Sequence, residues 1–496
     1  MSRFRITTLG CKVNQYDGQA IAAALHRVGL RPADPDEPAA PVDLVVVNTC
    51  CVTATAMRKS RQALRRAVRS SPRAAVLVTG CYSDYDARRL RGVLAELGVP
   101  PANIALVGHH GDVAARVEQL ACRLRSRAGE PEKPASGPPD LPARPGGDDV
   151  SMSAAGDARI TASPDSIRTR RTAAVKANVP GTARLGSIDR FAAHQRAFVK
   201  VQDGCDAFCT YCIVAYTRPR VWSREPGEIL RECRRLVEAG HKEIVLCGVF
   251  LGAFGRATAV RRRWDDAPSA LPELLKQVAG LDGLWRVRLS SLEPGDVSDE
   301  LLAAVRDLPQ AAPHFHLPLQ SGSPRVLQRM NRQYTVDDYR RTIERIRSAL
   351  DRPAITTDVI VGFPGEGAED FAATLDAARH AGFAKIHAFP FSPIEGTAAW
   401  QVRREAPSPD VAKRRMAELA ELEGELARAF RRRFVGETLE ALVERPRGAG
   451  RQRVAMTGRY LTVTFPAPDD ADLTGRVVRV RIEAVTPAGL AGRLVP

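Results

Sequence analysis

The sequence has no long hydrophobic run. No stretch of eighteen consecutive apolar residues occurs among its 496 residues, and about that length is needed to cross a bilayer as a helix. The first residues, MSRFRITTLGC, pass directly into a strand pattern and lack the apolar core of a secretory signal peptide. We therefore expect a cytoplasmic protein with no membrane partner.

Paired cysteines are also scarce. The chain has ten cysteines, and only Cys209 and Cys212 form a C-x₂-C pair. In a reducing compartment cysteines serve more often as metal ligands or core residues than in disulfides. Structural zinc usually takes four ligands in two separated pairs. The missing second pair disfavours zinc, and a zinc-stabilised RNA-binding protein is kept as the non-enzymatic alternative.

Acidic residues are outnumbered by basic residues, 57 to 73, which gives a formal net charge of +16. Such a surplus suits a polyanionic partner such as RNA, which is bound through its phosphates. Arginine far outnumbers lysine, and Ala, Gly and Pro are abundant. The base composition of the genome is therefore an equally good explanation of the charge.

What the sequence does contain is a cysteine-rich loop after a short apolar strand. Residues 198–212 read FVKVQDGCDAFCTYC, so that Cys205, Cys209 and Cys212 follow the spacing C-x₃-C-x₂-C. A four-iron cluster normally takes four cysteines. Three cysteines leave one iron open, which allows that iron to bind a reacting ligand.

Three further cysteines follow three predicted strands near the N-terminus. The strands RITTL, LVVV and AVLV are followed by Cys11, Cys50 and Cys81. Val/Leu runs that alternate with helices predict a parallel sheet, and ligand sites gather at the carboxyl edge of such sheets. We therefore expect a second three-cysteine cluster there, against the alternative of three buried core cysteines. Cys51 is left out, because neighbours on an extended chain point apart.

Composition divides the chain into four parts. The fold class predicted from their patterns is α/β. Residues 2–125 form the parallel-sheet domain, and residues 126–190, rich in Pro and Gly, are predicted to be a disordered linker. Residues 191–424 alternate strand and helix six times, too few for a closed eight-stranded barrel, so a partial (β/α)6 barrel is predicted. Residues 432–496 read as a small all-β domain. The remaining cysteines are assigned to the core or as bystanders.

The loops after the barrel strands carry polar residues suited to an amino acid and a ribose. These cofactor-binding candidates are Tyr211, Ser290, Glu293, Gln320 and Asp358. Turn chemistry is the competing explanation of these loops. His314 and His316 are interpreted as structural. In the last domain the exposed basic positions expected to bind RNA are Arg445, Arg447, Arg451, Arg453 and Arg459.

These motifs resemble the methylthiotransferase family of radical S-adenosylmethionine (SAM) enzymes, over nearly the whole chain except the linker. The branch they resemble most is the tRNA N6-threonylcarbamoyladenosine methylthiotransferases. Departures from that branch are Cys51, the sequence YSDYD after Cys81, TRPRVWSRE at 217–225, and a longer linker. The resemblance rests on TLGCKVNQYDG (8–18), VVNTCCVT (46–53), QDGCDAFCTYCIV (202–214), RLSSLEP (288–294), HFHLPLQSGSPRVLQRMNRQYT (314–335) and TTDVIVGFPGE (356–366).

The resemblance implies a radical SAM core, a C-terminal TRAM-like RNA-binding domain and two [4Fe–4S] clusters with SAM. It implies methylthiolation of C2 of N6-threonylcarbamoyladenosine at tRNA position 37, next to the anticodon. Partners would be the tRNA anticodon stem-loop, an electron donor and a sulfur source, and we expect a monomer. The alternatives are methylthiolation of N6-isopentenyladenosine in tRNA or of an aspartate in a ribosomal protein.

Overall fold

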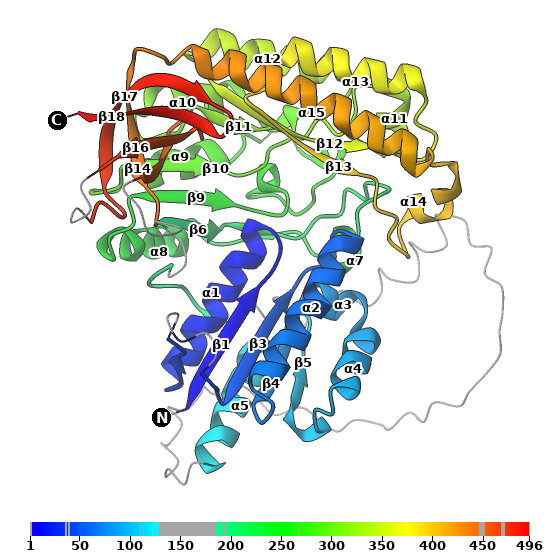
Figure 1. The fold of residues 1–496 in the computed structure, drawn as a ribbon, viewed down its shortest axis with the longest axis vertical. Coiled ribbons are helices and arrows are strands. Elements are labelled where there is room, and N and C mark those ends of the chain that lie inside the picture. The colour runs from blue at the N-terminus through cyan, green and yellow to red at the C-terminus, as the bar shows by residue number, and fades with distance from the viewer. Residues whose placement is uncertain are drawn as a thin grey trace.

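The computed structural model describes residues 2–34, 37, 40–109, 111–127, 185–191, 195–265, 267–445, 452–467 and 472–495. They form an N-terminal sheet domain, a partial barrel and a small closed β barrel in chain order, and the termini lie on different units (Figure 1). The α/β fold class predicted from the sequence is confirmed. No helix in these ranges is long and apolar enough to span a membrane.

The N-terminal domain is a five-stranded parallel sheet with helices on both faces. Its strand order is β2-β1-β3-β4-β5. Leu44 and Val46 pack in the cluster that includes α1 and α5, whereas Val45 and Val47 pack in the cluster of α2 and α4. Because both faces are covered, the central strand β3 can be apolar at four consecutive positions, Leu44 to Val47. The bounds are β1 Arg3–Thr8, α1 Lys12–Arg27, β2 Arg31–Pro32, β3 Leu44–Thr49, α2 Ala54–Ser70, β4 Ala75–Gly80, α3 Cys81–Tyr85, α4 Ala87–Glu96, β5 Ile104–Leu106 and α5 Val113–Arg127.

The predicted linker, residues 126–190, lies mostly outside the described residues, and described structure reaches into it at both ends. Ser126 and Arg127 belong to helix α5. At the other end Leu185 and Ile188 are buried, and the Ile188 amide donates to the Glu232 carboxylate at 2.7 Å. These apolar side chains, three residues apart, anchor the segment between α1 and the barrel.

Six parallel strands form the central barrel, as predicted. Two three-stranded halves, β10-β9-β6 and β11-β12-β13, are joined by bridges between β10 and β11 such as Ser291 with His316. The strands are β6 Arg196–Lys200, β9 Glu243–Cys247, β10 Arg286–Leu289, β11 His314–His316, β12 Ala354–Val361 and β13 Lys385–Pro390. The helices are α7 Val214–Thr217, α8 Pro226–Glu238, α9 Leu271–Ala279, α10 Asp299–Asp307, α11 Pro324–Arg329, α12 Val336–Ala349, α13 Ala368–Ala381 and α14 Ala398–Gln401. A short hairpin, β7 Gln202–Asp203 with β8 Trp222–Ser223, flanks the cysteine loop.

The barrel strands alternate between two kinds of side chain. One set is apolar and packs against the outer helices, for example Val287 and Leu289 on β10. The other set includes Arg286 and Arg288 on the same strand, and it faces the inside of the barrel. The lumen therefore carries charged groups from β10 beside apolar side chains, since Val245 of β9 and Phe198 of β6 share the register and face of Arg288.

The C-terminal domain is a closed barrel of five strands in the order β14-β15-β16-β18-β17. Its turn at residues 457–460 reaches the amino ends of the large barrel's strands, where Arg288 donates to the Gly458 carbonyl at 3.0 Å. Tyr460 stacks on His314 with ring centroids 5.0 Å apart. Helix α15, Pro409–Arg432, packs on β13 and α13. The strands are β14 Thr438–Val443, β15 Gln452–Thr457, β16 Thr462–Pro466, β17 Val477–Thr486 and β18 Gly489–Val495.

Candidate functional site

The loop that carries Cys205, Cys209 and Cys212 follows the β6 end of the barrel and is held at both ends by backbone hydrogen bonds. The Cys205 amide donates to the Arg218 carbonyl at 3.0 Å, and the Thr210 amide donates to the Met330 carbonyl at 3.0 Å. All three cysteines are partly exposed. The loop is therefore fixed by the barrel while its thiols remain accessible.

Arg332 supplies a positive charge beside this loop. Its guanidinium donates to Cys209 Sγ at 3.1 Å and to the Tyr211 hydroxyl at 3.3 Å, and it pairs with Glu293. Burial raises the pKa of Cys212 to about 12, with Cys209 adding to the effect. A thiol with that pKa keeps its proton at neutral pH until a metal displaces it.

The N-terminal cysteines follow three adjacent strands of the sheet, as predicted. Two glycines make the turns possible, because both have positive φ and both lie against neighbouring chain. A Cβ on Gly10 would lie 2.9 Å from Cys50 Sγ, and a Cβ on Gly80 would lie 2.2 Å from the Thr49 carbonyl oxygen. The turn before Cys11 is thereby pressed against Cys50.

Cys81 has the most polar surroundings of the six. His109 Nε2 lies 3.4 Å from its sulfur, and Arg218 Nε donates to it at 3.5 Å. Desolvation by the protein packed around the sulfur, followed by the nearby Cys81, raises the pKa of Cys11, although the residue keeps one exposed side. Cys50 and Cys81 are buried and Cys11 is exposed, so the sheet edge brings the three together with one side open to solvent.

The expectation that Cys51 points away from this group is wrong. Its thiol hydrogen bonds to Cys81, and this bond, aided by Arg218 against the effect of burial, lowers the pKa of Cys81. The reason is that strand β3 ends at Thr49, so the alternation of an extended chain does not continue through Cys50 and Cys51.

A buried ion network joins the two cysteine groups. Arg218 donates to Asp203 and to Asp17, in each case at 2.7 Å. Lys200 pairs with the same two carboxylates at 2.9 and 2.5 Å, and all four side chains are at most 5% exposed. Arg218 thus contacts Cys81 through its side chain and Cys205 through its carbonyl.

The donor sets fit clusters better than single metal ions. Within the described ranges no three His, Cys, Asp or Glu side chains are placed to hold one ion. Zinc needs every thiolate about 2.3 Å from a common centre. The thiolates of a four-iron cluster each bind a different iron, so they need not converge. Two separate groups of three thiols with an adjoining buried arginine are consistent with that arrangement.

Comparison with known proteins identifies the units. Residues 3–97 match the uncharacterized protein family UPF0004, residues 199–378 match the radical SAM superfamily and residues 432–495 match the TRAM domain. The threonylcarbamoyladenosine tRNA methylthiotransferase MtaB of Chlamydia pneumoniae is 32% identical over 99% of this chain and 98% of its own. MtaB of Bacillus subtilis (strain 168) is 30% identical over 97% of this chain and 94% of its own.

A third relative carries a different name. The tRNA-2-methylthio-N(6)-dimethylallyladenosine synthase of Maricaulis maris (strain MCS10) is 32% identical over 99% of this chain and 97% of its own. The chain belongs to the radical SAM tRNA methylthiotransferase family. It is therefore an enzyme that acts on tRNA, and the radical SAM superfamily implies SAM and one [4Fe–4S] cluster.

The five predicted SAM-binding residues differ in their contacts with the protein. Ser290 Oγ and Gln320 Oε1 are buried and have no hydrogen-bond partner among the described residues. Glu293 instead pairs with Arg261 and Arg332, Asp358 pairs with His316 at 3.3 Å, and Tyr211 accepts from Arg332. The structure thus leaves Ser290 and Gln320 free for a ligand and engages the other three.

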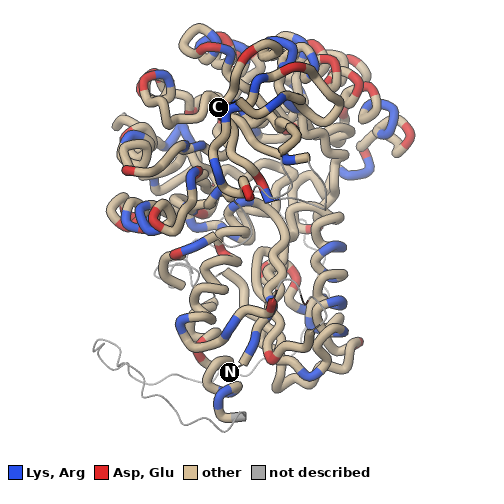
Figure 2. The backbone as a smooth tube through the Cα atoms, turned by 60° about the vertical axis from the view of Figure 1, so that its left-hand side comes forward, with Lys and Arg blue, Asp and Glu red and all other residues tan. Residues whose placement is uncertain are grey.

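The predicted RNA-binding arginines of the TRAM domain are placed unevenly. Arg445 is exposed, and Arg451, like Arg447, lies outside the described residues. The expected exposure is wrong for Arg453, which is 9% exposed, and for Arg459, which donates to the Asp351 and Arg352 carbonyls of the barrel. Alternate residues of β15 face the inside of its barrel, which explains Arg453. Basic residues also occur over the N-terminal domain and the large barrel (Figure 2).

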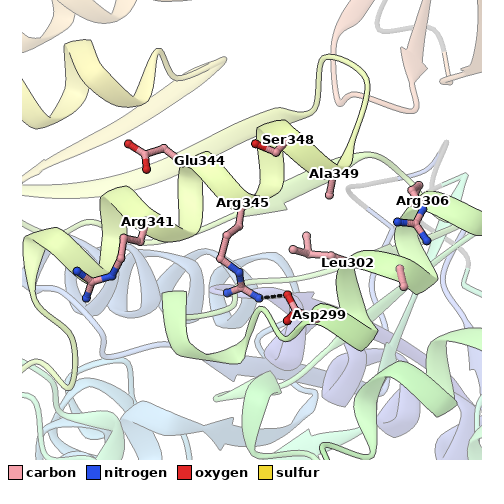
Figure 3. A pocket seen from close by; sticks show the side chains of 9 residues that line it. Asp299, Leu302, Arg306, Arg341, Glu344, Arg345, Ser348 and Ala349 are labelled. Carbon is pink, nitrogen blue, oxygen red and sulfur yellow. Dashed lines mark hydrogen bonds and ion pairs between the residues drawn. The ribbon is translucent and has the colours of Figure 1, made fainter.

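A surface hollow of about 600 Å³ lies between α10 and α12 on the outer helical layer. An ion pair between Arg345 and Asp299 crosses it (Figure 3). None of the cysteines and none of the predicted site residues line it. It therefore plays no part in the site.

Sequence reasoning missed Arg218, Lys200, Asp17, His109 and Arg332. Each contacts a cysteine or a partner of one through residues that are distant in the chain, for example 201 positions between Arg218 and Asp17. The one available signal was Arg218 in the segment TRPRVWSRE, which stood out only as a departure from the family pattern.

Proposed function

We propose that the protein methylthiolates C2 of N6-threonylcarbamoyladenosine at position 37 of tRNA. Cys205, Cys209 and Cys212 would hold the radical SAM cluster. Cys11, Cys50 and Cys81 would hold a second [4Fe–4S] cluster. The names of two relatives that match over nearly the full chain support this nucleoside.

The observation that carries the two-cluster proposal is the position of Arg218. This one residue contacts Cys81 of the N-terminal group and, through its carbonyl, the backbone of Cys205. This contact supports one shared site at the junction of the sheet domain and the barrel, which adjoin each other in Figure 1. When bound, SAM and the clusters supply the radical and the methylthio group that an unactivated adenine C–H bond requires.

The chain's own residues position the reactants. Ser290 and Gln320 offer unpartnered polar atoms for SAM. Phe208 beside Cys209 and Phe389 at the end of β13 are 46% and 45% exposed. Exposed aromatic faces stack on unpaired bases, so both suit a base from the anticodon loop. The exposed Arg445 supports a phosphate contact by the TRAM domain.

The deciding experiment is the nucleoside profile of tRNA from a strain that lacks the gene. Mass spectrometry should show loss of the 2-methylthio form and accumulation of N6-threonylcarbamoyladenosine. Reintroduced wild-type protein should restore it, and a Cys50→Ala variant should not. Persistence of the 2-methylthio form, with no second enzyme of this family in the strain, contradicts the proposal.

A second candidate nucleoside is N6-isopentenyladenosine, which the name of the Maricaulis relative favours. The same nucleoside profile separates the two, because only one of the unmodified precursors will accumulate. If both 2-methylthio nucleosides persist and a ribosomal-protein aspartate loses its methylthio group, the protein acts on that aspartate instead of on tRNA. A zinc-stabilised RNA-binding protein would contain stoichiometric zinc after anaerobic reconstitution and show no iron–sulfur absorbance.

A further inference from the structure

The lumen of the large barrel is a positively charged chamber. Two arginines on β10, Arg286 and Arg288, share one carboxylate, that of Glu243 on β9, at 2.6 and 2.9 Å. Arg196 on β6 pairs with Glu444 at 3.1 Å. These ion pairs leave one arginine charge without a matching carboxylate at this end of the chamber.

The side chain of Tyr460 closes this end of the chamber, and its pKa responds to the unmatched positive charge. Burial raises the pKa of Tyr460, but Arg196, Lys12 and Arg288 outweigh it, so that the pKa is lowered. Burial and Arg288 hold the pKa of His314 well below its ordinary value. His314 is therefore neutral at pH 7. Asp358 adds one carboxylate to the chamber, 3.3 Å from His316, so the cations Arg196, Arg286, Arg288 and Lys12 outnumber the carboxylates Glu243, Glu444 and Asp358 by one.

Lys12 is the cation of the chamber that comes from another domain. It is the first residue of α1 and follows Cys11 directly. Helix α1 packs on β6, and its Asp17 pairs with Lys200 at 2.5 Å, which fixes the start of the helix against the carboxyl end of that strand. Lys12 thus enters the chamber from the side of the cysteines.

The position and surroundings of Lys12 place its ammonium at the chamber. Helix α1 starts at Lys12 and packs on β6, which places Lys12 beside the chamber. In agreement with this position, its charge affects the pKa of four groups from four elements: Cys247 of β9, His314 of β11, His387 of β13 and Tyr460 of the TRAM turn. Lys12 is partly exposed, and no hydrogen bond or ion pair of its ammonium occurs within the described part of the chain. An accessible cation in a positive chamber favours an anionic ligand.

We propose that Lys12 is a specificity-determining residue that binds a carboxylate on the N6 substituent of the target adenosine. This inference rests on the proposed function. The threonylcarbamoyl group carries the carboxylate of threonine, whereas the isopentenyl group is a hydrocarbon. A hydrocarbon in this chamber would displace water from charged groups without replacing their hydrogen bonds. The charge of the chamber therefore selects between the two nucleosides.

The position of Lys12 also orients the substrate. Because Lys12 is bonded to Cys11 in the chain, a substituent held by Lys12 keeps its base beside the N-terminal cysteines. His387 is exposed on the neighbouring wall, and it supplies a further hydrogen-bonding group for the substituent.

The test measures binding of anticodon stem-loop RNAs to the full-length, cluster-reconstituted protein by fluorescence anisotropy. The RNAs carry unmodified adenosine, N6-threonylcarbamoyladenosine or N6-isopentenyladenosine at position 37. Wild-type protein should bind the threonylcarbamoyl RNA about tenfold more tightly than the unmodified RNA, as one hydrogen bond to a charged group provides. Lys12→Gln should abolish this preference, and Lys12→Arg should retain most of it.

Lys276→Gln is the matched control, because Lys276 is an exposed lysine on α9 outside the barrel, and its preference should equal that of the wild type. A Lys12→Gln protein that keeps the preference overturns the inference. So does one that loses iron, because Lys12 would then act on cluster binding. The methylthiolated product of the wild type tests the proposed function separately. Product from the isopentenyl RNA alone would reject both that function and the inference.

Discussion

The two cysteine groups reach the same site by opposite routes. Cys205, Cys209 and Cys212 lie in one loop, and their spacing is already a property of the local sequence. Cys11, Cys50 and Cys81 come from three strands and meet only because the sheet places three carboxyl ends side by side. The loop cysteines depend on backbone hydrogen bonds to the barrel. The sheet cysteines depend on the fold of the whole N-terminal domain and on the packing of that domain against the barrel.

The difference extends to the surroundings of the sulfurs. The loop thiols are all partly exposed, whereas Cys50 and Cys81 are buried. Each group has one sulfur beside a buried arginine, Cys209 with Arg332 and Cys81 with Arg218. Arg332 belongs to the same barrel as its cysteine, and Arg218 crosses from one domain to another. Separate perturbations of the two groups should therefore have separable consequences.

The largest effect is expected from Cys209→Ala. The variant removes a ligand of the proposed radical SAM cluster, so both SAM cleavage and methylthiolation should be lost completely. SAM cleavage is measured as 5′-deoxyadenosine released per chain under reducing, anaerobic conditions. Cys122→Ala is the control, because Cys122 lies on α5 and contributes to neither group. Substantial cleavage by the Cys209 variant would show that the loop is not the radical source.

Cys50→Ala should separate the two groups. The loop cluster stays intact, so SAM cleavage should persist while methylthiolation is abolished. Iron should fall from about eight to about four per chain, the content of one cluster in place of two. Cys51→Ser is the matched neighbour and should keep the full iron content. Loss of SAM cleavage in a folded Cys50 variant that retains the other cluster would contradict this division of roles.

Arg218→Met should weaken the junction between the groups. Asp17 and Asp203 would lose their shared arginine and keep Lys200 as their common partner, and breaking such a buried pair costs about 3–5 kcal/mol. The loss of stability is measured by urea denaturation with tryptophan fluorescence as the signal, because Trp222 lies beside Lys200. The reduction potential of the sheet cluster should fall through loss of the hydrogen bond to Cys81. Arg332→Met, its counterpart, should shift only the potential of the loop cluster.

Acid should weaken the same junction through Asp203, with the smallest effect. Burial opposes the charged form, but Arg218 and Lys200 outweigh it and hold the pKa of Asp203 far below its ordinary value. The unfolded chain therefore binds this proton at a higher pH than the folded chain does. Stability is fully present above about pH 4 and falls by about 1–3 kcal/mol as the pH drops further. Asp203→Asn should flatten that pH dependence of the urea midpoint, and an unchanged slope would exclude Asp203 as its source.

The sequence predicted the parts of the fold that local patterns specify. The strands that end at Cys11, Cys50 and Cys81 were visible as apolar runs followed by turns, and a parallel sheet brings such ends together wherever it forms. The six barrel strands were visible for the same reason. A small all-β C-terminal domain was predicted from its short β segments, and the structure shows that it is a closed barrel.

The contacts that complete the site were beyond such patterns. Arg218, Asp17 and Lys200 meet across two domains, and no spacing in the chain marks them. Cys51 was misplaced because strand alternation was extended past the end of β3. Arg453 and Arg459 were predicted to be exposed because they are basic. The sequence of a β segment does not show which of its side chains will face the inside of a barrel or a neighbouring domain. Each of these depends on tertiary packing.

The turn at residues 457–460 lets the TRAM domain close one end of the large barrel, in addition to the RNA contact proposed for it. Tyr460 and the carbonyls beside it occupy the far end of the catalytic chamber, on the arginines of β10. A truncation that removes this domain would therefore open that end of the barrel and remove hydrogen-bond acceptors of Arg286 and Arg288. It would also remove the proposed tRNA contact of the domain. Because the TRAM turn covers that end, we expect a base to enter from the opposite end, beside the two cysteine groups.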